Sequence, residues 1–338
     1  MKSIQITAPG IVRLTEQEIP ELKPGYVLLK IHYVGFCGSD LNTFKGLNPL
    51  VKMPVVPGHE IGATIEGVGT GVPGSFQRGM KVTVNPYTNC GKCPSCLNRR
   101  YNACEYNETL GVQRNGAMAE YLIVPWEKVI AEDKLSVKEL ALVEPMSVGF
   151  HAIDRASVTD IDNVLVIGCG MIGVGAIVRS AIRGANVIAV DVDDKKLEIA
   201  KKLGAAFVIN SLKEDLHERI QFITGGRGAD VVIEAVGRPE TYIASITEAT
   251  FTGRVVYIGY AKEKIPLDTQ YIVKKELNIM GSRNALPADF IAVIEYLKKG
   301  TCPVNSLISG IYPPQEAQNV LEKWAAAPGD VFRILIQF

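Results

Sequence analysis

The chain has 338 residues, of which 47% are hydrophobic and 21% are charged, a balance typical of folded globular proteins rather than disordered or fibrous ones. At roughly 100–200 residues per domain, this length predicts about two domains. Lys plus Arg and Asp plus Glu each number 36, so the chain lacks the positive excess of proteins that bind nucleic acid or acidic membranes.

The longest uncharged apolar stretch, residues 163–178, is shorter than the roughly 20 residues that a membrane span needs. The first residues do not form the apolar core of a signal peptide. We therefore expect a cytoplasmic protein with no membrane partner and no nucleic-acid partner.

The first 145 residues are expected to be rich in β-strands. Residues 26–34 contain many β-branched and aromatic side chains, and residues 61–68 and 81–84 are shorter runs of the same kind. Pro-Gly pairs interrupt these runs repeatedly. Short strands separated by such turn residues predict a β-sandwich or barrel.

From residue 163 onward, apolar strand-like runs alternate with helix-like segments. The run at 163–167 is continuously apolar, as expected for a strand buried on both faces. Further strand-like runs follow at 186–190, 207–209, 231–233 and 255–258. This alternation predicts a parallel sheet with helices on both faces.

The end of the chain contains two helix candidates, at 289–299 and 314–324, and an apolar strand at 331–336. The residue pattern does not decide whether this tail extends the second domain or returns to the first.

A GxGxxG motif, formed by Gly168, Gly170 and Gly173, directly follows the apolar strand. In a dinucleotide-binding unit, these glycines allow a tight turn, close approach of the pyrophosphate and close helix–strand packing. Asp191 stands 18 residues after Gly173, near the spacing of the acid that binds the adenosine ribose. A carboxylate there repels a 2′-phosphate, and Val192 stands where an NADP enzyme would carry arginine, so NAD is favoured.

Four of the seven cysteines are clustered between residues 90 and 104. Cys90, Cys93, Cys96 and Cys104 offer four thiolates, a set that holds Zn²⁺ in a closed tetrahedron with no open position. In a reducing compartment such clustering indicates a metal rather than disulfides. The spacing therefore predicts a structural zinc, with redox thiols or an iron–sulfur cluster as alternatives.

A second, dispersed set of metal-binding residue types comprises Cys37, His59, Glu60 and Glu144. Thiolate, imidazole and carboxylate are ligands that suit a catalytic zinc with one open position. From spacing alone, however, a buried structural role for Cys37 and His59 is the simpler interpretation.

These motifs, together and in this order, resemble the zinc-dependent medium-chain dehydrogenase/reductase family, in the branch of the sorbitol and threonine dehydrogenases. The segments that carry the resemblance are residues 35–40, 58–60, 90–104, 144–145 and 168–173. The family's fold class is α/β. The resemblance implies a chaperonin-10-like β-rich catalytic domain at 1–146 and 288–338, and a doubly wound Rossmann NAD-binding domain at 147–287. It also implies an active-site cleft between the domains.

The resemblance further implies two zinc ions per chain, one structural and one catalytic. The catalytic zinc would be held by Cys37 and His59, with Glu60 or Glu144 as the carboxylate ligand, and Ser39 would take the substrate proton. The residues expected to bind the NAD cofactor are Gly168, Gly170, Met171, Ile172, Gly173, Asp191, Val236, Gly259 and Arg283.

The sequence departs from the family at Asn42, where related enzymes often carry histidine. Because asparagine does not titrate near neutral pH, any proton relay is expected to leave through the ribose hydroxyl and water. Asp40 would orient a zinc ligand. His32, His151 and His217 lie outside the motifs and are interpreted as structural or surface residues.

A narrower resemblance, over residues 274–276 and 280–285, is to bacterial dehydrogenases that oxidise C5 of hexonates such as L-galactonate and L-gulonate. Arg283 could bind a carboxylate or a polyol hydroxyl in two-pronged fashion, or could instead bond backbone or cofactor. The expected function is therefore NAD-dependent and zinc-dependent oxidation of a secondary alcohol of a sugar acid. A sorbitol-like polyol dehydrogenase is the alternative.

Two hypotheses belong to other classes of protein. A non-catalytic zinc- and NAD-binding regulator is disfavoured because the candidate catalytic ligands are all present. A nucleic-acid-binding zinc segment, suggested by Arg99 and Arg100 beside Cys96, is disfavoured by the zero net charge. The expected partners are a small-molecule substrate and further copies of the chain, as a homodimer or homotetramer.

Overall fold

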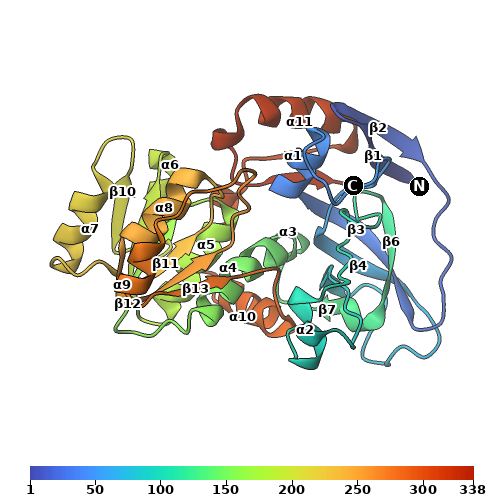
Figure 1. The fold of residues 1–338 in the computed structure, drawn as a ribbon. Helices are drawn as coiled ribbons and strands as arrows, with labels where there is room; N and C mark the ends of the chain where they lie inside the picture. The colour runs from blue at the N-terminus through green and yellow to red at the C-terminus, as the bar shows by residue number, and fades with distance from the viewer. The chain divides into compact units, whose positions relative to one another are not determined.

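A computed structural model describes residues 1–338, apart from the side chain of Asp330. The chain divides into two compact units, Met1–Glu144 with Leu286–Phe338 and Pro145–Ala285. We call them the β-rich unit and the parallel-sheet unit. Figure 1 shows that the C-terminal helix α11 lies beside the N-terminal strands, so the tail belongs to the β-rich unit.

The β-rich unit is built on a mixed, mainly antiparallel sheet in which the strand order is β14-β15-β3-β4-β5-β7, with β6 also paired to β3. A separate hairpin is formed by β1 and β2. The strands of this unit are β1 (Lys2–Ala8), β2 (Ile11–Glu16), β3 (Tyr26–Phe36), β4 (Glu60–Val68), β5 (Lys81–Val84), β6 (Tyr121–Pro125), β7 (Val129–Ala131), β14 (Gly310–Tyr312) and β15 (Ile334–Gln337).

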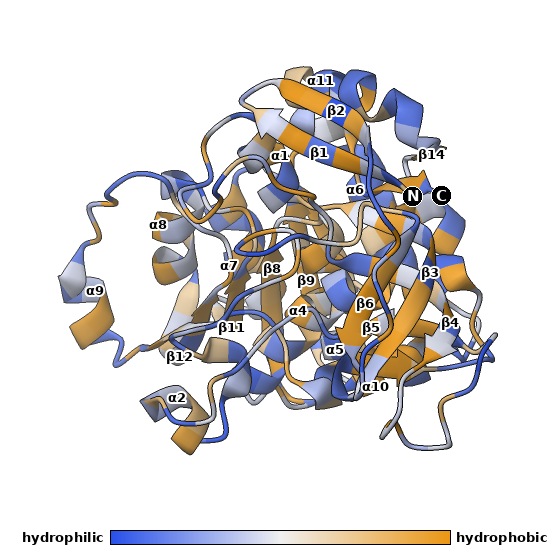
Figure 2. Cartoon of the chain, turned by 90° about the vertical axis from the view of Figure 1, so that its right-hand side faces the viewer, coloured by the Kyte–Doolittle hydropathy of each residue, from blue (hydrophilic) through white to orange (hydrophobic). Residues whose placement is uncertain are grey.

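Strand β3 shows why these residues form a sheet. Val27, Leu29 and Ile31 are buried whereas Lys30 is exposed, the alternation of a strand with one face on the core. Figure 2 shows hydrophobic residues concentrated along strands of this unit. The closing strand is observed at Ile334–Gln337 rather than 331–336, because pairing with β3 begins at Ile334.

This unit also contains five short helices within its described residues. They are α1 (Gly38–Phe44), α2 (Pro94–Leu97), α3 (Val137–Leu140), α10 (Pro287–Leu297) and α11 (Ala317–Ala326), with 3-10 turns at Tyr101–Ala103, Trp126–Lys128, Val304–Leu307, Pro314–Glu316 and Pro328–Asp330. Helix α4 (Val143–Arg155) runs across the boundary between the two units. Gly62 on β4 permits α3 to pack closely, since a Cβ there would lie 1.8 Å from the carbonyl oxygen of Val137.

The parallel-sheet unit contains six parallel strands in the order β10-β9-β8-β11-β12-β13. They are β8 (Asn163–Ile167), β9 (Asn186–Asp191), β10 (Phe207–Asn210), β11 (Ala229–Glu234), β12 (Ala249–Tyr257) and β13 (Asn278–Gly281). The helices are α5 (Met171–Ile182), α6 (Asp194–Lys202), α7 (Leu216–Thr224), α8 (Pro239–Thr247) and α9 (Thr269–Lys274).

The order of these strands is that of a doubly wound dinucleotide-binding sheet, with the topological switch between β8 and β11. In β8, Val164, Leu165 and Val166 are fully buried, as the continuous apolar run predicts. The predicted fold class is confirmed. None of the described helices combines the length and the apolar character that crossing a bilayer requires.

Candidate active site

Three predicted ligand residues meet in the β-rich unit. The ligand atoms of Cys37, His59 and Glu60 all lie within 4.8 Å of one another. The cause is strand pairing: β3 and β4 are antiparallel and Gly35 pairs with Glu60. The residues just after β3 and at the start of β4 therefore lie side by side.

Asp40 joins the two segments that carry these ligands. Its carboxylate is fully buried and accepts hydrogen bonds from the backbone N–H groups of Cys37, at 2.8 Å, and Gly58, at 3.4 Å. Burial raises the pKa of Asp40, although the charge of His59 and the two N–H donors oppose the increase. Asp40 thus fixes the backbone on both sides of the cluster.

Cys37 and His59 each shift the pKa of the other. Burial alone would raise the pKa of the Cys37 thiol, but the hydrogen bond and the charge of His59 outweigh it and lower the value to about 7. Burial would lower the pKa of His59, yet the hydrogen bond and charge of Cys37 and the charge of Glu144 raise it. The sulfur is thereby favoured as a thiolate, the form that binds metals.

Glu60 is fully buried, and neither of its carboxylate oxygens has a hydrogen-bond partner among the described residues. The Arg333 Nη1 atom lies 3.1 Å from Oε1, without hydrogen-bond geometry, and donates instead to the carbonyl oxygen of Phe36 at 2.6 Å. Burial raises the pKa of Glu60, and the charge of Arg333 opposes that shift. Gly35 leaves room for this carboxylate, because a Cβ there would lie 2.0 Å from Oε2.

Glu144, the other predicted carboxylate ligand, stands near the start of α4 and is also buried. It is not part of the three-residue cluster, and its Oε1 accepts a hydrogen bond from the Tyr87 hydroxyl. Burial, together with the charge of Glu144, raises the pKa of Tyr87 well above its usual value. Ser39 lies in the first turn of α1, and its hydroxyl is buried without a hydrogen-bond partner among the described residues.

The donor set fits a zinc ion. A thiolate, an imidazole and a carboxylate whose oxygens accept no hydrogen bond are gathered in a buried position. Arg333 lies beside the carboxylate, and a metal ion would further offset the cost of burying two anions. The set provides three protein ligands, the number typical of a catalytic zinc with an open position.

The four clustered cysteines also meet. The sulfur atoms of Cys90, Cys93, Cys96 and Cys104 lie within 4.8 Å of one another, and all four are free thiols. Backbone N–H groups of Glu105 and Cys96 donate to Cys93 and lower its pKa to about 6. Thiols gathered without disulfides and supplied with N–H donors fit a four-coordinate zinc.

In the parallel-sheet unit, each glycine of the GxGxxG loop has the predicted surroundings. Gly168 adopts a left-handed conformation with φ +95°, and a Cβ on Gly173 would lie 1.8 Å from the Gly168 carbonyl oxygen. Gly170, the N-cap of α5, faces open space. The loop therefore combines a tight turn, close packing and an uncovered approach to a helix N-terminus. Met171 and Ile172 open that helix.

Asp191 ends β9 beside this loop. Its carboxylate accepts hydrogen bonds from the backbone N–H groups of Cys169, at 2.7 Å, and Val192, at 2.8 Å. Val236, Gly259 and Arg283 follow β11, β12 and β13 respectively. All the predicted cofactor residues thus lie at the carboxyl edge of the parallel sheet, where doubly wound folds bind dinucleotides.

Sequence patterns did not identify three buried residues of these sites: Tyr87, Arg333 and Glu234. Glu234 accepts hydrogen bonds from the backbone N–H groups of Val236, at 2.8 Å, and Gly237, at 2.7 Å. None of the three belongs to a motif with metal-ligand or phosphate-binding spacing. The only sequence signal for Glu234 is a charge at the end of an apolar strand.

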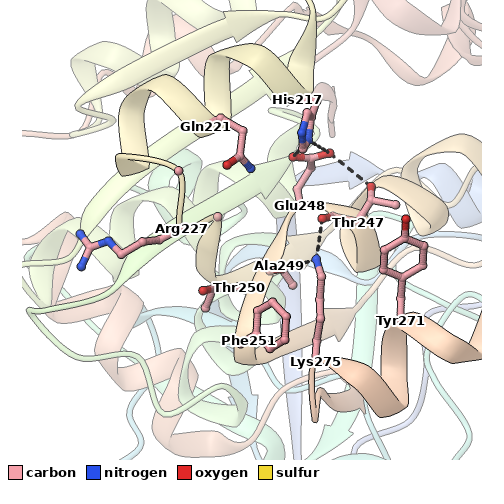
Figure 3. Close-up of a pocket in the computed structure, with 12 residues that line it drawn as sticks. His217, Gln221, Arg227, Thr247, Glu248, Ala249, Thr250, Phe251, Tyr271 and Lys275 are labelled. Carbon is pink, nitrogen blue, oxygen red and sulfur yellow. Dashed lines mark hydrogen bonds and ion pairs between the residues drawn. The ribbon is translucent and has the colours of Figure 1, made fainter.

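A cavity of about 630 Å³ lies at the opposite, amino edge of this sheet, where β11 and β12 begin. Figure 3 shows His217 pairing with Glu248, and Lys275 directed at the end of α8. The His217 Nδ1 lies 3.0 Å from Glu248, and the Lys275 Nζ donates to the Thr247 carbonyl at 2.8 Å. Among the described side chains that line the cavity, no buried polar atom lacks a partner. We therefore assign no site to it.

Comparison with known proteins identifies the family. Residues 23–134 match the alcohol dehydrogenase GroES-like domain, and residues 172–299 match the zinc-binding dehydrogenase family. The chain is 34% identical over 300 residues to L-galactonate-5-dehydrogenase of Escherichia coli K12, covering 88% of this chain and 87% of the relative. It is 32% identical to D-arabitol-phosphate dehydrogenase of Enterococcus avium, covering 100% and 97% of the two chains.

A solved structure from Escherichia coli CFT073, described as a short chain alcohol dehydrogenase complexed with NADH, has 31% identity and a TM-score of 0.91 over 100% of this chain and 99% of that chain. The chain belongs to the zinc-dependent medium-chain dehydrogenase family, in a branch whose relatives include polyol and sugar-alcohol dehydrogenases. It is a zinc-containing, NAD-dependent dehydrogenase that acts on a small molecule.

The glycine loop gives a test that separates folding from cofactor binding. Gly170→Ala should weaken NADH binding by about tenfold or more, because a methyl group would occupy the open space that the pyrophosphate approaches. Its melting temperature should stay near that of the unmutated chain. Gly173→Ala should instead destabilise the fold by about 1–3 kcal/mol, because its Cβ would clash with backbone.

Fluorescence titration with NADH and thermal unfolding measure the two effects. Unchanged NADH affinity in a folded Gly170→Ala variant would contradict the assignment of this loop to the pyrophosphate.

Proposed function

We propose that the chain oxidises a secondary alcohol of a sugar acid, a hexonate such as L-gulonate or L-galactonate at C5, with NAD as acceptor. The observation that carries the catalytic part is the buried Cys37–His59–Glu60 cluster, whose carboxylate oxygens have no hydrogen-bond partner among the described residues. Such a set calls for a divalent cation and, with three ligands, leaves a position for substrate.

In this proposal Cys37, His59 and Glu60 hold the catalytic zinc, and the four clustered cysteines hold the structural zinc. Bound zinc lowers the pKa of a substrate hydroxyl and NAD accepts the hydride. Ser39 would accept the hydroxyl's hydrogen bond at its buried Oγ and pass the proton outward. Asp40 would keep the Cys37 and Gly58 backbones in register through its two hydrogen bonds.

Asp191 supports NAD rather than NADP. Its two carboxylate oxygens are already fixed by backbone donors beside the glycine loop, so the carboxylate is held in place to receive ribose hydroxyls. The 2′-phosphate of NADP at the same position would be repelled by this carboxylate and by Asp193, two residues further on.

The choice of a sugar acid rests on Arg283 and on the likeness to L-galactonate-5-dehydrogenase. Arg283 follows the last strand at the carboxyl edge of the parallel sheet, the edge where the cofactor is expected. A guanidinium binds a carboxylate or a phosphate bidentately. A polyol is the second candidate, and the relative that acts on D-arabitol phosphate adds polyol phosphates as a third.

We also propose a homodimer or homotetramer. Strand β13 is the outermost strand of its sheet, and nearby apolar side chains are exposed, with Ile279 at 38% and Val273 at 80%. An apolar edge strand of this kind favours pairing with another chain. Light scattering should give a mass at least twice that of one chain at micromolar concentration, and a monomer would contradict the proposal.

The two metal sites should differ in lability. A chelator should remove the ion of the Cys37 site first and abolish activity, because its coordination is open, whereas the four-cysteine ion should resist removal. Elemental analysis and activity measured over the same time course test this. An active chain with at most one metal ion would contradict the two-zinc assignment.

The substrate class is tested by NADH production from a panel of hexonates, the matching alditols and alditol phosphates. We expect the hexonates to have the highest kcat/KM. Arg283→Ala should lower kcat/KM for the best hexonate by roughly 10- to 150-fold, the equivalent of losing a charge-assisted contact of about 1.5–3 kcal/mol, and should lower that for the alditol less.

The measurements require equal zinc occupancy and saturating NAD, since Arg283 could also contact the cofactor. An alditol that is oxidised as efficiently as the acid would favour a polyol as the substrate. A preference for alditol phosphates would favour a polyol phosphate. If the protein binds NADH but oxidises no compound of the panel, the alternative of a non-catalytic zinc- and NAD-binding regulator would be favoured.

A further inference from the structure

The zinc site has two buried acids, Glu60 and Glu144, of which one suffices for a three-ligand site. Glu60 is fully buried and Glu144 is 4% exposed. Only Glu60 belongs to the set whose ligand atoms lie within 4.8 Å of one another. The two acids differ in what holds their oxygens.

The surroundings of Glu60 leave its oxygens available. Neither oxygen has a hydrogen-bond partner among the described residues, and Gly35 provides the space that Oε2 occupies. Arg333, at 3.1 Å from Oε1, balances its charge. A carboxylate in this state can ligate a metal without first breaking a hydrogen bond.

Glu144, in contrast, is held by Tyr87. The Tyr87 hydroxyl donates to Oε1 of Glu144, and because both residues are buried, water does not compete for this bond. Before Glu144 can turn its Oε1 toward a metal, this bond must break.

Tyr87 itself is fixed from two sides. Its backbone N–H donates to the Asn85 side chain at 3.1 Å. Its ring meets Phe290 edge-on, with centroids 6.3 Å apart and planes at 74°. Only 5% of its surface is exposed, so neighbouring side chains restrict the ring and favour the orientation in which its hydroxyl bonds Glu144.

We propose that Tyr87 is a positioning residue, which holds Glu144 away from the metal by its hydroxyl and so leaves Glu60 as the resting carboxylate ligand. This inference rests on the proposed function, because that function supplies the catalytic zinc at Cys37 and His59. Loss of the Tyr87 hydroxyl alone would make the two acids competitors.

The test replaces the labile zinc by cobalt(II), whose visible absorption reports its ligands, and uses Tyr87→Phe, which keeps the ring and its contact with Phe290. In otherwise unmutated protein, Glu60→Gln should change the cobalt spectrum and speed metal release to a chelator by about tenfold or more. Glu144→Gln should leave the cobalt spectrum unchanged and should alter the rate of metal release by no more than about twofold.

In the Tyr87→Phe background, the cobalt spectrum should differ from that of the unmutated protein, and adding Glu144→Gln should restore it. In this background, Glu144→Gln should also change the rate at which the metal is released to the chelator. Tyr296→Phe is the matched control, because it removes another buried tyrosine hydroxyl of the same unit and should leave the spectrum unchanged. Thermal unfolding shows that each variant is folded.

A Tyr87→Phe spectrum equal to that of the unmutated protein, or a change that survives Glu144→Gln, would overturn the inference while the zinc site stands. A sensitivity to Glu144→Gln in otherwise unmutated protein would overturn it as well. If the unmutated protein gives no cobalt spectrum that Cys37→Ser abolishes, the proposed function fails and the inference with it.

Discussion

The pairing of Gly35 with Glu60 across β3 and β4 is the contact on which the proposed zinc site depends. It places the end of one strand beside the start of the next, so Cys37 and His59 meet although 22 residues separate them. Gly35 also supplies the space for the Glu60 carboxylate. The Asp40 carboxylate then accepts hydrogen bonds from both segments, which holds the backbone that carries the ligands in place.

Local patterns were sufficient to predict the elements whose cause is local. The apolar run of β8, the glycine loop and the four-cysteine segment each depend on residues within a few positions of one another. The dispersed ligands Cys37, His59 and Glu60 are different, because spacing alone did not favour a site over packed core residues. Only the resemblance to a family, carried by all the motifs in their order, favoured a metal site over packed core residues.

Residues that act across the chain could not be predicted from the sequence. Arg333 reaches the carbonyl oxygen of Phe36 from 297 residues away, and nothing in its neighbourhood marks it as part of a metal site. The same holds for Tyr87, which follows an Asn-Pro pair in a segment without regular secondary structure and meets Glu144 only through the fold. The alternation of strand β3 predicted its buried face. Its antiparallel pairing with β4, which completes the site, is set by the tertiary structure and is not visible in the local sequence.

The charges buried around Cys37 support the proposal that this site binds a cation. Four acidic groups, Cys37, Asp40, Glu60 and Glu144, stand against two basic ones, His59 and Arg333. Burial raises the pKa of both Asp40 and Glu60. A divalent ion would offset part of this negative charge. Because Cys37 and His59 must give up protons to ligate it, its binding should release protons and become tighter as pH rises. The buried acids whose burial is costly to the fold are therefore the same groups that would give a metal its affinity.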